Sequence, residues 1–180
     1  AAGIFKFVFS SSATVYGEPS ELPLHEASPV NPALNPYGQT KLQIELMLRE
    51  LAKSNKDWSI AALRYFNPIG AHPSGMIGEN PRDIPNNLMP YMLDVAVGER
   101  TSLSIYGADY DTIDGTGVRD YIHIMDLASG HIAALHALFK KNGVHTYNLG
   151  TGEGTSVLQL LRTFESSTGR TIPFTVAPRR

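Results

Sequence analysis

Hydrophobic and polar residues follow one another along the chain in blocks that predict strands and helices in alternation. Residues 4–9 and 58–66 are apolar at nearly every position, which is typical of parallel strands buried on both faces. Between them, residues 35–53 place Leu42, Leu46 and Leu51 among the apolar positions of a helix. Strand, helix and strand in this order predict a right-handed parallel crossover.

The same patterns continue to the end of the chain. A helix is predicted from Asn87 to Val97, and Gly98 closes it. Thr155 is the predicted cap of a later helix. The other expected elements are strands at 103–106 and 171–176, a strand that ends at 147–150, and helices at 126–140 and 156–167. Alternation of this kind predicts an α/β protein with a parallel sheet.

Composition excludes several classes of function. The 180 residues are 42% hydrophobic and 18% charged, as in a globular chain with a sizeable core, and the net charge is −2. No basic patch is visible, so nucleic acid is not an expected partner. The absence of cysteine excludes disulfides and thiolate zinc sites and fits a reducing compartment, so we expect a cytoplasmic protein without a bound metal. No apolar run approaches 18 residues, so no membrane partner is expected.

The first strand begins almost at the first residue, with no signal peptide before it. A protein rarely begins inside its own central strand. We therefore expect the sequence to be an excerpt of a longer one.

The stretch 35–41 carries the strongest chemical signal. Asn35 and Pro36 suit the start of a helix, and Tyr37 and Lys41 then share one face of it, about one turn apart. A free tyrosine has a pKa of about 10, and a nearby ammonium favours its phenolate form. The pair therefore predicts a general base for an alcohol proton, although this spacing alone also occurs in ordinary surface pairs.

Four further patterns each allow two interpretations. Ser10, Ser11 and Ser12 follow the first strand, where they form either a plain turn or a ligand-binding edge with Ser12 beside Tyr37. The acids of 109–114 suggest calcium, but their spacing favours solvated turns. The glycines of 150–154 resemble a phosphate loop without its Lys-Ser/Thr, or form a tight turn. His131 and His136, five apart, predict core or surface roles rather than a metal site.

Five motifs in order resemble the UDP-glucose 4-epimerases of the extended short-chain dehydrogenase/reductase superfamily. They are FSSSATVYG (9–17), NPYGQTK (35–41), LRYFNPIGAHPSG (63–75), PNNLMPY (85–91) and DGTGVRDYIHIMDLA (114–128). The likeness continues through YNLGTGEGTSV to the final APRR and covers essentially all of the chain.

This resemblance implies a fold and its limits. The expected fold is part of a Rossmann-type doubly wound parallel sheet with a smaller α/β substrate-binding region. Residues 1–67 would form the second half of the NAD-binding domain. Residues 68–180 would mainly bind nucleotide sugar, with 121–150 packing back on the first sheet. The family's Gly-x-x-Gly-x-x-Gly turn and its closing segment are missing, so we expect the isolated piece to be inactive.

The resemblance also implies a reaction with NAD as the cofactor. Tyr37 would take the proton of the sugar 4-hydroxyl while carbon 4 is oxidised, and UDP-glucose and UDP-galactose would interconvert after the 4-keto sugar turns over. Lys41 would hold the nicotinamide ribose, and Ser12 would bond the sugar hydroxyl. Tyr65, Ser10 and Ser11 are the other expected cofactor residues.

The remaining expected residues hold the substrate. Arg119 would bind the diphosphate, and Tyr106 would lie by the uracil. The other expected substrate-binding residues are Phe66, Asn67, Asn87, Leu88, Tyr121 and Arg180. The family often forms homodimers, and the helix of Tyr37 is a candidate interface.

Two alternatives remain open. Related dehydratases place an Asp-Glu pair where this chain has Ala13 and Thr14, and the absence of a carboxylate there favours the epimerase. A non-catalytic nucleotide-sugar-binding module, or a degenerate fragment, would also account for the nucleotide motifs and the missing glycine turn.

Overall fold

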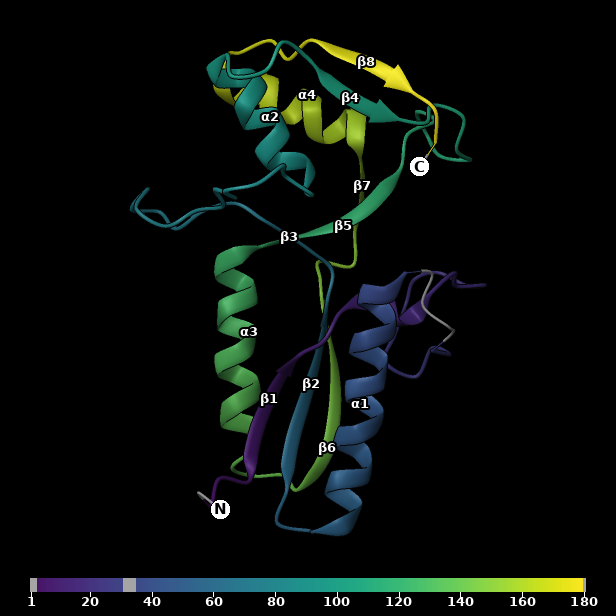
Figure 1. The fold of residues 1–180 in the computed structure, drawn as a ribbon, viewed down its shortest axis with the longest axis vertical. Coiled ribbons are helices and arrows are strands. Elements are labelled where there is room, and N and C mark those ends of the chain that lie inside the picture. The colour runs from purple at the N-terminus through teal and green to yellow at the C-terminus, as the bar shows by residue number, and fades with distance from the viewer. Residues whose placement is uncertain (1–2, 31–34, 180) are drawn as a thin grey trace. The chain divides into compact units, whose positions relative to one another are not determined.

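The computed structural model describes residues 3–30 and 35–179 and divides into two compact units. The first unit comprises Ala1–Pro68 and Ile122–Gly152, and the second comprises Ile69–Tyr121 and Glu153–Arg180. Helices and parallel strands occur in both units, so the α/β class expected from the sequence is confirmed (Figure 1).

The first unit is built on a three-stranded parallel sheet. Its strands are β1 (Lys6–Ser10), β2 (Ser59–Tyr65) and β6 (Gly143–Leu149), in the order β1-β2-β6. In the register of the sheet Ser10 pairs with Leu63, which in turn pairs with Tyr147. The carboxyl ends of all three strands therefore meet at one edge, as the predicted crossover requires.

Two helices cover this sheet, α1 (Pro36–Ser54) and α3 (Ile124–Ala137). Figure 1 shows α1 on one side of the sheet and α3 on the other. Strand β2 is buried at every position before Tyr65 because both of its faces are covered, which explains its continuous apolar run. The core between sheet and α3 contains Ala61, Leu63, Ala134 and Leu138.

Local signals set the ends of these helices. The Asn35 side chain accepts a hydrogen bond from the Gly38 N–H (2.8 Å), and Pro36 occupies the first turn of α1, as predicted. Helix α3 begins two residues before the predicted Asp126 because the ring of His123 caps it, accepting from the Met125 N–H (3.2 Å).

The second unit packs two helices against a two-stranded parallel sheet. Strand β4 (Leu103–Tyr106) pairs with β8 (Phe174–Ala177), and the helices are α2 (Leu88–Val97) and α4 (Val157–Thr168). Gly98 closes α2 with a left-handed φ of 85°, as the sequence indicated. The core consists of Met92, Val95, Leu103, Ile105, Leu161 and Ile172.

The segment before α4 differs from the prediction. Ser156, not Thr155, caps α4: its Oγ accepts from the Gln159 N–H (3.0 Å), and the Gln159 side chain accepts from the Ser156 N–H (2.9 Å). Thr155 instead lies in a short strand, β7 (Gly154–Ser156), opposite Arg119 of β5 (Val118–His123). This antiparallel pairing was not predicted, because a three-residue strand has too little pattern to be recognised.

Strand β3 (Asn67–Ile69) and the 3₁₀ helix η1 (Ala13–Tyr16) complete the fold. In the acidic segment, the Asp114 carboxylate accepts from the backbone N–H of Thr116 (2.9 Å) and from its hydroxyl (2.7 Å), and also from the Ser156 hydroxyl. Within residues 3–30 and 35–179, no group of three His, Cys, Asp or Glu side chains could hold a metal ion, and no helix could cross a membrane.

Candidate functional site

The predicted catalytic pair lies at the carboxyl edge of the sheet of the first unit. Tyr37 is the second residue of α1 and is 51% exposed. The Nζ of Lys41 lies 5.4 Å from the centroid of the Tyr37 ring and donates a hydrogen bond to the carbonyl oxygen of Ser10 (2.8 Å). The structure thus brings Tyr37, Lys41 and Ser10 together, although Ser10 and Lys41 are 31 residues apart in the sequence.

The position of Lys41 follows from the helix that carries it. Side chains four apart lie one above the other on an α-helix, so a lysine at 41 is directed past Tyr37 toward the sheet edge. Its ammonium also lies 5.3 Å from the ring centroid of Phe9, the residue before Ser10. An ammonium has three N–H donors, and Ser10 takes one of them. Lys41 therefore keeps donors for a hydroxyl-bearing ligand.

Ser12 is nearly buried, with 7% of its surface exposed, and its side chain caps η1. The Oγ of Ser12 accepts from the backbone N–H of Thr14 (3.2 Å) and from the Thr14 hydroxyl (2.9 Å). A hydroxyl that accepts in this way still has its own O–H to donate. This arrangement suits a hydroxyl that donates to an oxygen of a substrate.

Ser11 is fully buried, and its hydroxyl donates to Oε1 of Glu45 (2.6 Å). Glu45 also accepts from Arg64, whose Nε reaches Oε1 (2.9 Å) and whose terminal nitrogen reaches Oε2 (2.6 Å). The sequence analysis missed this pair, although Glu45 continues the series of Tyr37 and Lys41 at four-residue intervals. The cofactor role expected of Ser11 stays a prediction, and in this structure its hydroxyl is engaged with Glu45.

The pKa directions show that both members of the buried pair are charged at neutral pH. Burial alone raises the pKa of Glu45, but hydrogen bonds from Arg64 and Ser11 outweigh it and hold that pKa below its ordinary value. Burial opposes the charge of Arg64 as well, and the bond to Glu45 raises the pKa of Arg64 in spite of it. The guanidinium carbon of Arg64 also lies 4.8 Å from the ring centroid of Tyr16.

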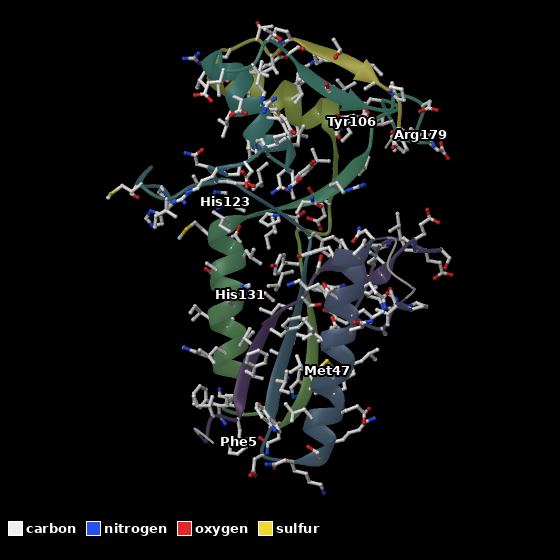
Figure 2. The ribbon with its side chains drawn as sticks, in the orientation of Figure 1. Phe5, Met47, Tyr106, His123, His131 and Arg179 are labelled. Carbon is white, nitrogen blue, oxygen red and sulfur yellow. The ribbon has the colours of Figure 1, made fainter. Side chains whose placement is uncertain are left out.

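Tyr65 and His131 also lie at this sheet edge, next to Ser10. His131, on α3 (Figure 2), has its Nδ1 2.9 Å from the carbonyl oxygen of Leu127 and its Nε2 3.0 Å from the hydroxyl of Ser10. A carbonyl only accepts, so we assign the proton to Nδ1, and Nε2 accepts from Ser10. The rings of Tyr65 and His131 are 6.1 Å apart. The contact of His131 with Ser10 spans 121 residues, so no local spacing could have revealed it.

Burial raises the pKa of Tyr65, the nearby Tyr37 raises it further, and the side chain of Ser10 acts in the opposite direction. Tyr65 therefore favours its neutral phenol form, which can donate a hydrogen bond. The next two predicted residues are half-buried at the end of β2. The backbone N–H of Phe66 donates to the carbonyl oxygen of Leu149 (3.0 Å), and Asn67 begins β3.

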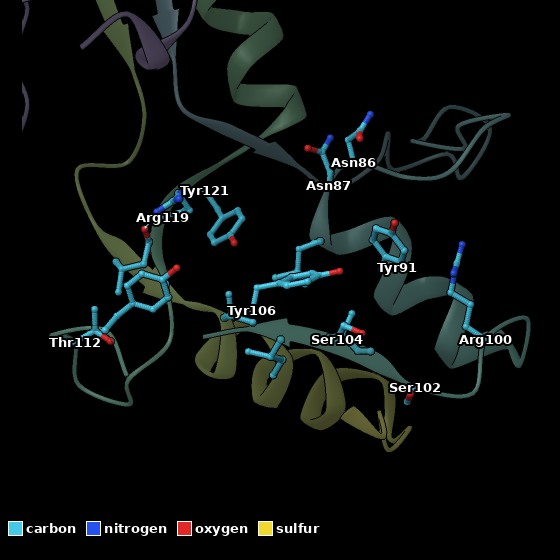
Figure 3. Close-up of a pocket in the computed structure, with 17 residues that line it drawn as sticks. Asn86, Asn87, Tyr91, Arg100, Ser102, Ser104, Tyr106, Thr112, Arg119 and Tyr121 are labelled. Carbon is cyan, nitrogen blue, oxygen red and sulfur yellow. Dashed lines mark hydrogen bonds between the residues drawn. The ribbon is translucent and has the colours of Figure 1, made fainter. Parts of the chain in front are cut away.

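The second unit contains a pocket of about 660 Å³ (Figure 3). Helix α2, strand β4, strand β5 and the loop between these two strands supply its lining. All of the substrate-binding residues predicted within the described part of this unit line it: Asn87, Leu88, Tyr106, Arg119 and Tyr121. Arg180, the other residue predicted there, lies outside the described residues.

The two arginines of this pocket differ in their pairing. Arg100 binds the Asp94 carboxylate (2.9 Å) and lies 4.8 Å from the ring centroid of Tyr91. Arg119 is exposed and donates to the backbone carbonyl of Val118 (2.7 Å), and no carboxylate of the described residues pairs with it. Arg119 is therefore the cation that is available to an anionic ligand.

Aromatic and amide groups complete the pocket. Figure 3 shows the rings of Tyr106 and Tyr121 directed into the same opening. Burial raises the pKa of Tyr121, and Arg119 acts in the opposite direction. The Asn87 amide donates to the Glu79 carboxylate (2.6 Å). A pocket with an available guanidinium, flat rings and amides suits a ligand that combines a planar polar ring with an anionic group.

The chain matches the model of the NAD dependent epimerase/dehydratase family over residues 1–150. It is 60% identical over its whole length to UDP-glucose 4-epimerase 1 of Oryza sativa subsp. japonica, covering 51% of that protein. It is also 57% identical over 178 residues to UDP-glucose 4-epimerase of Bacillus subtilis. That alignment covers 99% of this chain and 52% of the Bacillus subtilis protein. The chain thus spans about half the length of these curated relatives.

A solved structure gives the same assignment. The UDP-glucose 4-epimerase from Bifidobacterium longum, in complex with NAD+ and UDP, superposes with a TM-score of 0.93 at 54% sequence identity. The alignment covers 97% of this chain and 52% of that one. The family match, the identities and the shared fold together show that the chain belongs to the NAD dependent epimerase/dehydratase family.

Proposed function

We propose that this chain carries the catalytic groups and the nucleotide pocket of an NAD-dependent UDP-glucose 4-epimerase, which interconverts UDP-glucose and UDP-galactose. The single observation that carries the proposal is the pair of Tyr37 and Lys41 at the carboxyl edge of β1, with the Lys41 ammonium bonded to the Ser10 carbonyl. The relatives that share this sequence at 57–60% identity are UDP-glucose 4-epimerases.

The residues at this edge fit NAD. Lys41 has N–H donors beyond the one that Ser10 takes, and they suit the paired hydroxyls of a ribose. The half-exposed Tyr37 and the phenol of Tyr65 lie at the same edge, where open α/β sheets bind ligands. Bound there, NAD would supply the oxidising and reducing power for carbon 4 of the sugar.

Tyr37 is the proposed acid and base. Its phenolate takes the proton of the sugar 4-hydroxyl and later returns it to the oxygen of the inverted centre. The ammonium of Lys41 lies 5.4 Å from the ring centroid of Tyr37, so its positive charge can stabilise negative charge that develops on Tyr37 as the proton moves. Ser12 donates its O–H to the same sugar oxygen and keeps it in reach of Tyr37. General acid–base help of this kind typically contributes about 10²- to 10⁴-fold in rate.

The pocket of the second unit is the proposed nucleotide site. Arg119 binds the diphosphate, Tyr106 lies against the uracil, and Tyr121 with Asn87 and Leu88 completes the lining. Inversion at carbon 4 requires the sugar to turn over while the substrate stays bound. A firmly held nucleotide and a lightly held sugar meet both requirements.

Dehydration of the sugar is not favoured. Elimination of water at a neighbouring carbon needs an additional carboxylate, and the corresponding positions here are Ala13 and Thr14 in η1. The hydroxyl of Thr14 is also engaged with Ser12 (2.9 Å). Neither residue can act as the required acid or base.

A homodimer and a cytoplasmic location are separate parts of the proposal. Helix α1 exposes apolar side chains away from the sheet, and Met47 is 69% exposed. The exposed apolar residues of this helix are Ile44, Leu46, Met47 and Leu51. A second copy of α1 would cover them. Light scattering tests the dimer, and fractionation of cells tests the location.

The enzymatic test uses this chain in place of the corresponding segment of the Bacillus subtilis enzyme, a protein called here the grafted enzyme. NMR follows the sugar signals after UDP-galactose is added, with no NAD added. We expect conversion to UDP-glucose. A 4-keto-6-deoxy product would identify a dehydratase, and UDP binding without turnover would favour a non-catalytic module.

A further inference from the structure

Glu45 lies one further turn along the same face of α1 as Tyr37 and Lys41. The three residues are spaced by four, so they form a row on the helix surface that faces the sheet. Tyr37 is half exposed at the start of the row, whereas Glu45 is only 2% exposed. The row therefore leads from the site of the chemistry to a fully buried charge that no part of the proposed reaction uses.

Every polar atom of this buried group is bonded to a neighbouring strand or turn. Oε1 of Glu45 accepts from Arg64 of β2 (2.9 Å) and from Ser11 (2.6 Å), and Oε2 accepts from Arg64 (2.6 Å). The side chain of Arg64 is 3% exposed. Bonds to both ends of the carboxylate fix its orientation as well as its position.

These bonds define the register of α1 against the strand ends. Lys41 binds the carbonyl of Ser10, and Glu45 binds the hydroxyl of the next residue, Ser11. The helix is thus attached at two successive turns to two successive residues at the end of β1. A shift of one residue would rotate the helix by about 100° and break both attachments.

We propose that Glu45 is a positioning residue for the catalytic pair, which with Arg64 and Ser11 holds α1 in the register that keeps Lys41 on Ser10 and Tyr37 at the sheet edge. The inference rests on the proposed function for its kinetic consequences, but the geometry it claims is a property of the chain alone. A buried ion pair is weak evidence for stability, because apolar residues of similar size often replace it without loss. The bidentate, directional bonds of Glu45 instead fix the register of α1 against the strand ends, which apolar contacts would not specify.

The decisive variant removes both charges together. Glu45→Met with Arg64→Met leaves no buried charge unpaired, because Arg49, the other partner of Glu45 (3.8 Å), has a side chain that is 42% exposed. We therefore expect an unfolding midpoint close to that of the unsubstituted grafted enzyme. We expect kcat to fall roughly 10- to 100-fold, because misplacement of a catalytic group by about 1 Å has costs of that order. The KM for UDP-galactose should stay within about twofold, since the residues proposed to bind the nucleotide are unchanged.

Glu45→Asp is the second variant, and it keeps the charge. Its carboxylate is one methylene shorter, so it can reach Arg64 and Ser11 only if α1 moves. We expect kcat to fall while the protein stays folded. Glu50→Gln is the matched control, because Glu50 lies on the same helix and its ion pair with Lys53 is about 70% exposed. This control should change neither kcat nor the unfolding midpoint.

A measurement on the full chain separates this inference from the proposed function. Nitrogen-15 NMR of the Lys41 ammonium reports its bond to Ser10 without any turnover. We expect a distinct, slowly exchanging signal in the chain and in Glu50→Gln, and its loss in Glu45→Met/Arg64→Met. If the ammonium signal persists in that variant, or if its kcat is unchanged, Glu45 does not set the register and the inference is wrong. An inactive grafted enzyme with the expected ammonium signals would instead overturn the proposed function alone.

Discussion

The candidate sites of the two units differ in how completely their polar groups bind one another. At the sheet edge of the first unit they bind one another: Lys41 binds Ser10, Ser10 binds His131, and Ser11 binds Glu45. In the pocket of the second unit, Arg100 binds Asp94 and Asn87 binds Glu79, but Arg119 has no carboxylate partner among the described residues. Groups that perform chemistry need fixed positions, whereas groups that capture a ligand need unsatisfied bonds.

The largest expected effect is on the stability of the first unit. Glu45→Ala leaves the Arg64 guanidinium buried and unpaired, which typically costs about 3–5 kcal/mol. We expect the free energy of unfolding of the chain to fall by this amount in a urea titration. A loss below about 1 kcal/mol would show that water reaches Arg64 and that the polar groups of the first unit are not held in fixed positions.

Acid should weaken the same contact without a substitution. The pKa of Glu45 is lowered in the folded chain from an ordinary value of 4.5, so the pair contributes fully above that pH. This contribution is lost progressively as the pH falls below about 4.5. In that range Glu45 binds a proton more tightly in the unfolded chain than in the folded one, so acid favours the unfolded state. Other carboxylates titrate in the same range, so the measurement is the difference between the chain and Glu45→Gln in urea titrations from pH 7 to pH 3. That difference should shrink with acid, and a constant difference would contradict the assignment.

In the second unit we expect an effect on binding rather than on folding. Arg119→Ala should weaken UDP binding roughly 10- to 150-fold, the equivalent of about 1.5–3 kcal/mol for charge-assisted hydrogen bonds. Titration calorimetry of the chain with UDP measures this change. Arg100→Ala is the control, because Arg100 lines the same pocket but is bound to Asp94. If both variants lost UDP affinity equally, Arg100 would contribute to UDP binding as much as Arg119 does, in spite of its bond to Asp94.

The smallest effect is expected on the exposed surface of α1. Lys53 and Glu50 form a salt bridge of 2.7 Å, and both side chains are about 70% exposed. Lys53→Ala should change the free energy of unfolding by no more than about 0.5 kcal/mol. A larger loss in a urea titration would mean that exposure does not separate this pair from the one formed by Glu45 and Arg64.

Much of the fold could be predicted because its signals are local. The continuous apolar run of β2 reflects burial on both faces. Asn35 and Pro36 correctly predicted where α1 begins. Strand β7 was not predicted, because a three-residue strand is held by its antiparallel partner β5 rather than by its own pattern. Thr155 and Ser156 are both acceptable cap residues, and both lie in β7; the reciprocal hydrogen bonds with Gln159 identify Ser156 as the cap.

The candidate site was predictable to a similar extent. Tyr37 and Lys41 have a fixed spacing on one helix, so their proximity follows from the sequence. The contacts of Ser10 with His131 and of Glu45 with Arg64 depend on which elements pack together, and no spacing within one element encodes them. Glu45 could have been noticed, since an acidic residue on the buried face of a helix needs a partner.

The central claim is that chemistry depends on the first unit and nucleotide binding on the second, and Tyr37→Phe in the grafted enzyme tests it most directly. The substitution removes only the hydroxyl of a half-exposed ring. We expect turnover of UDP-galactose to fall about 10²- to 10⁴-fold while the Kd for UDP stays within about twofold. Turnover close to that of the unsubstituted protein, or a loss of UDP affinity as large as the loss of turnover, would contradict the account.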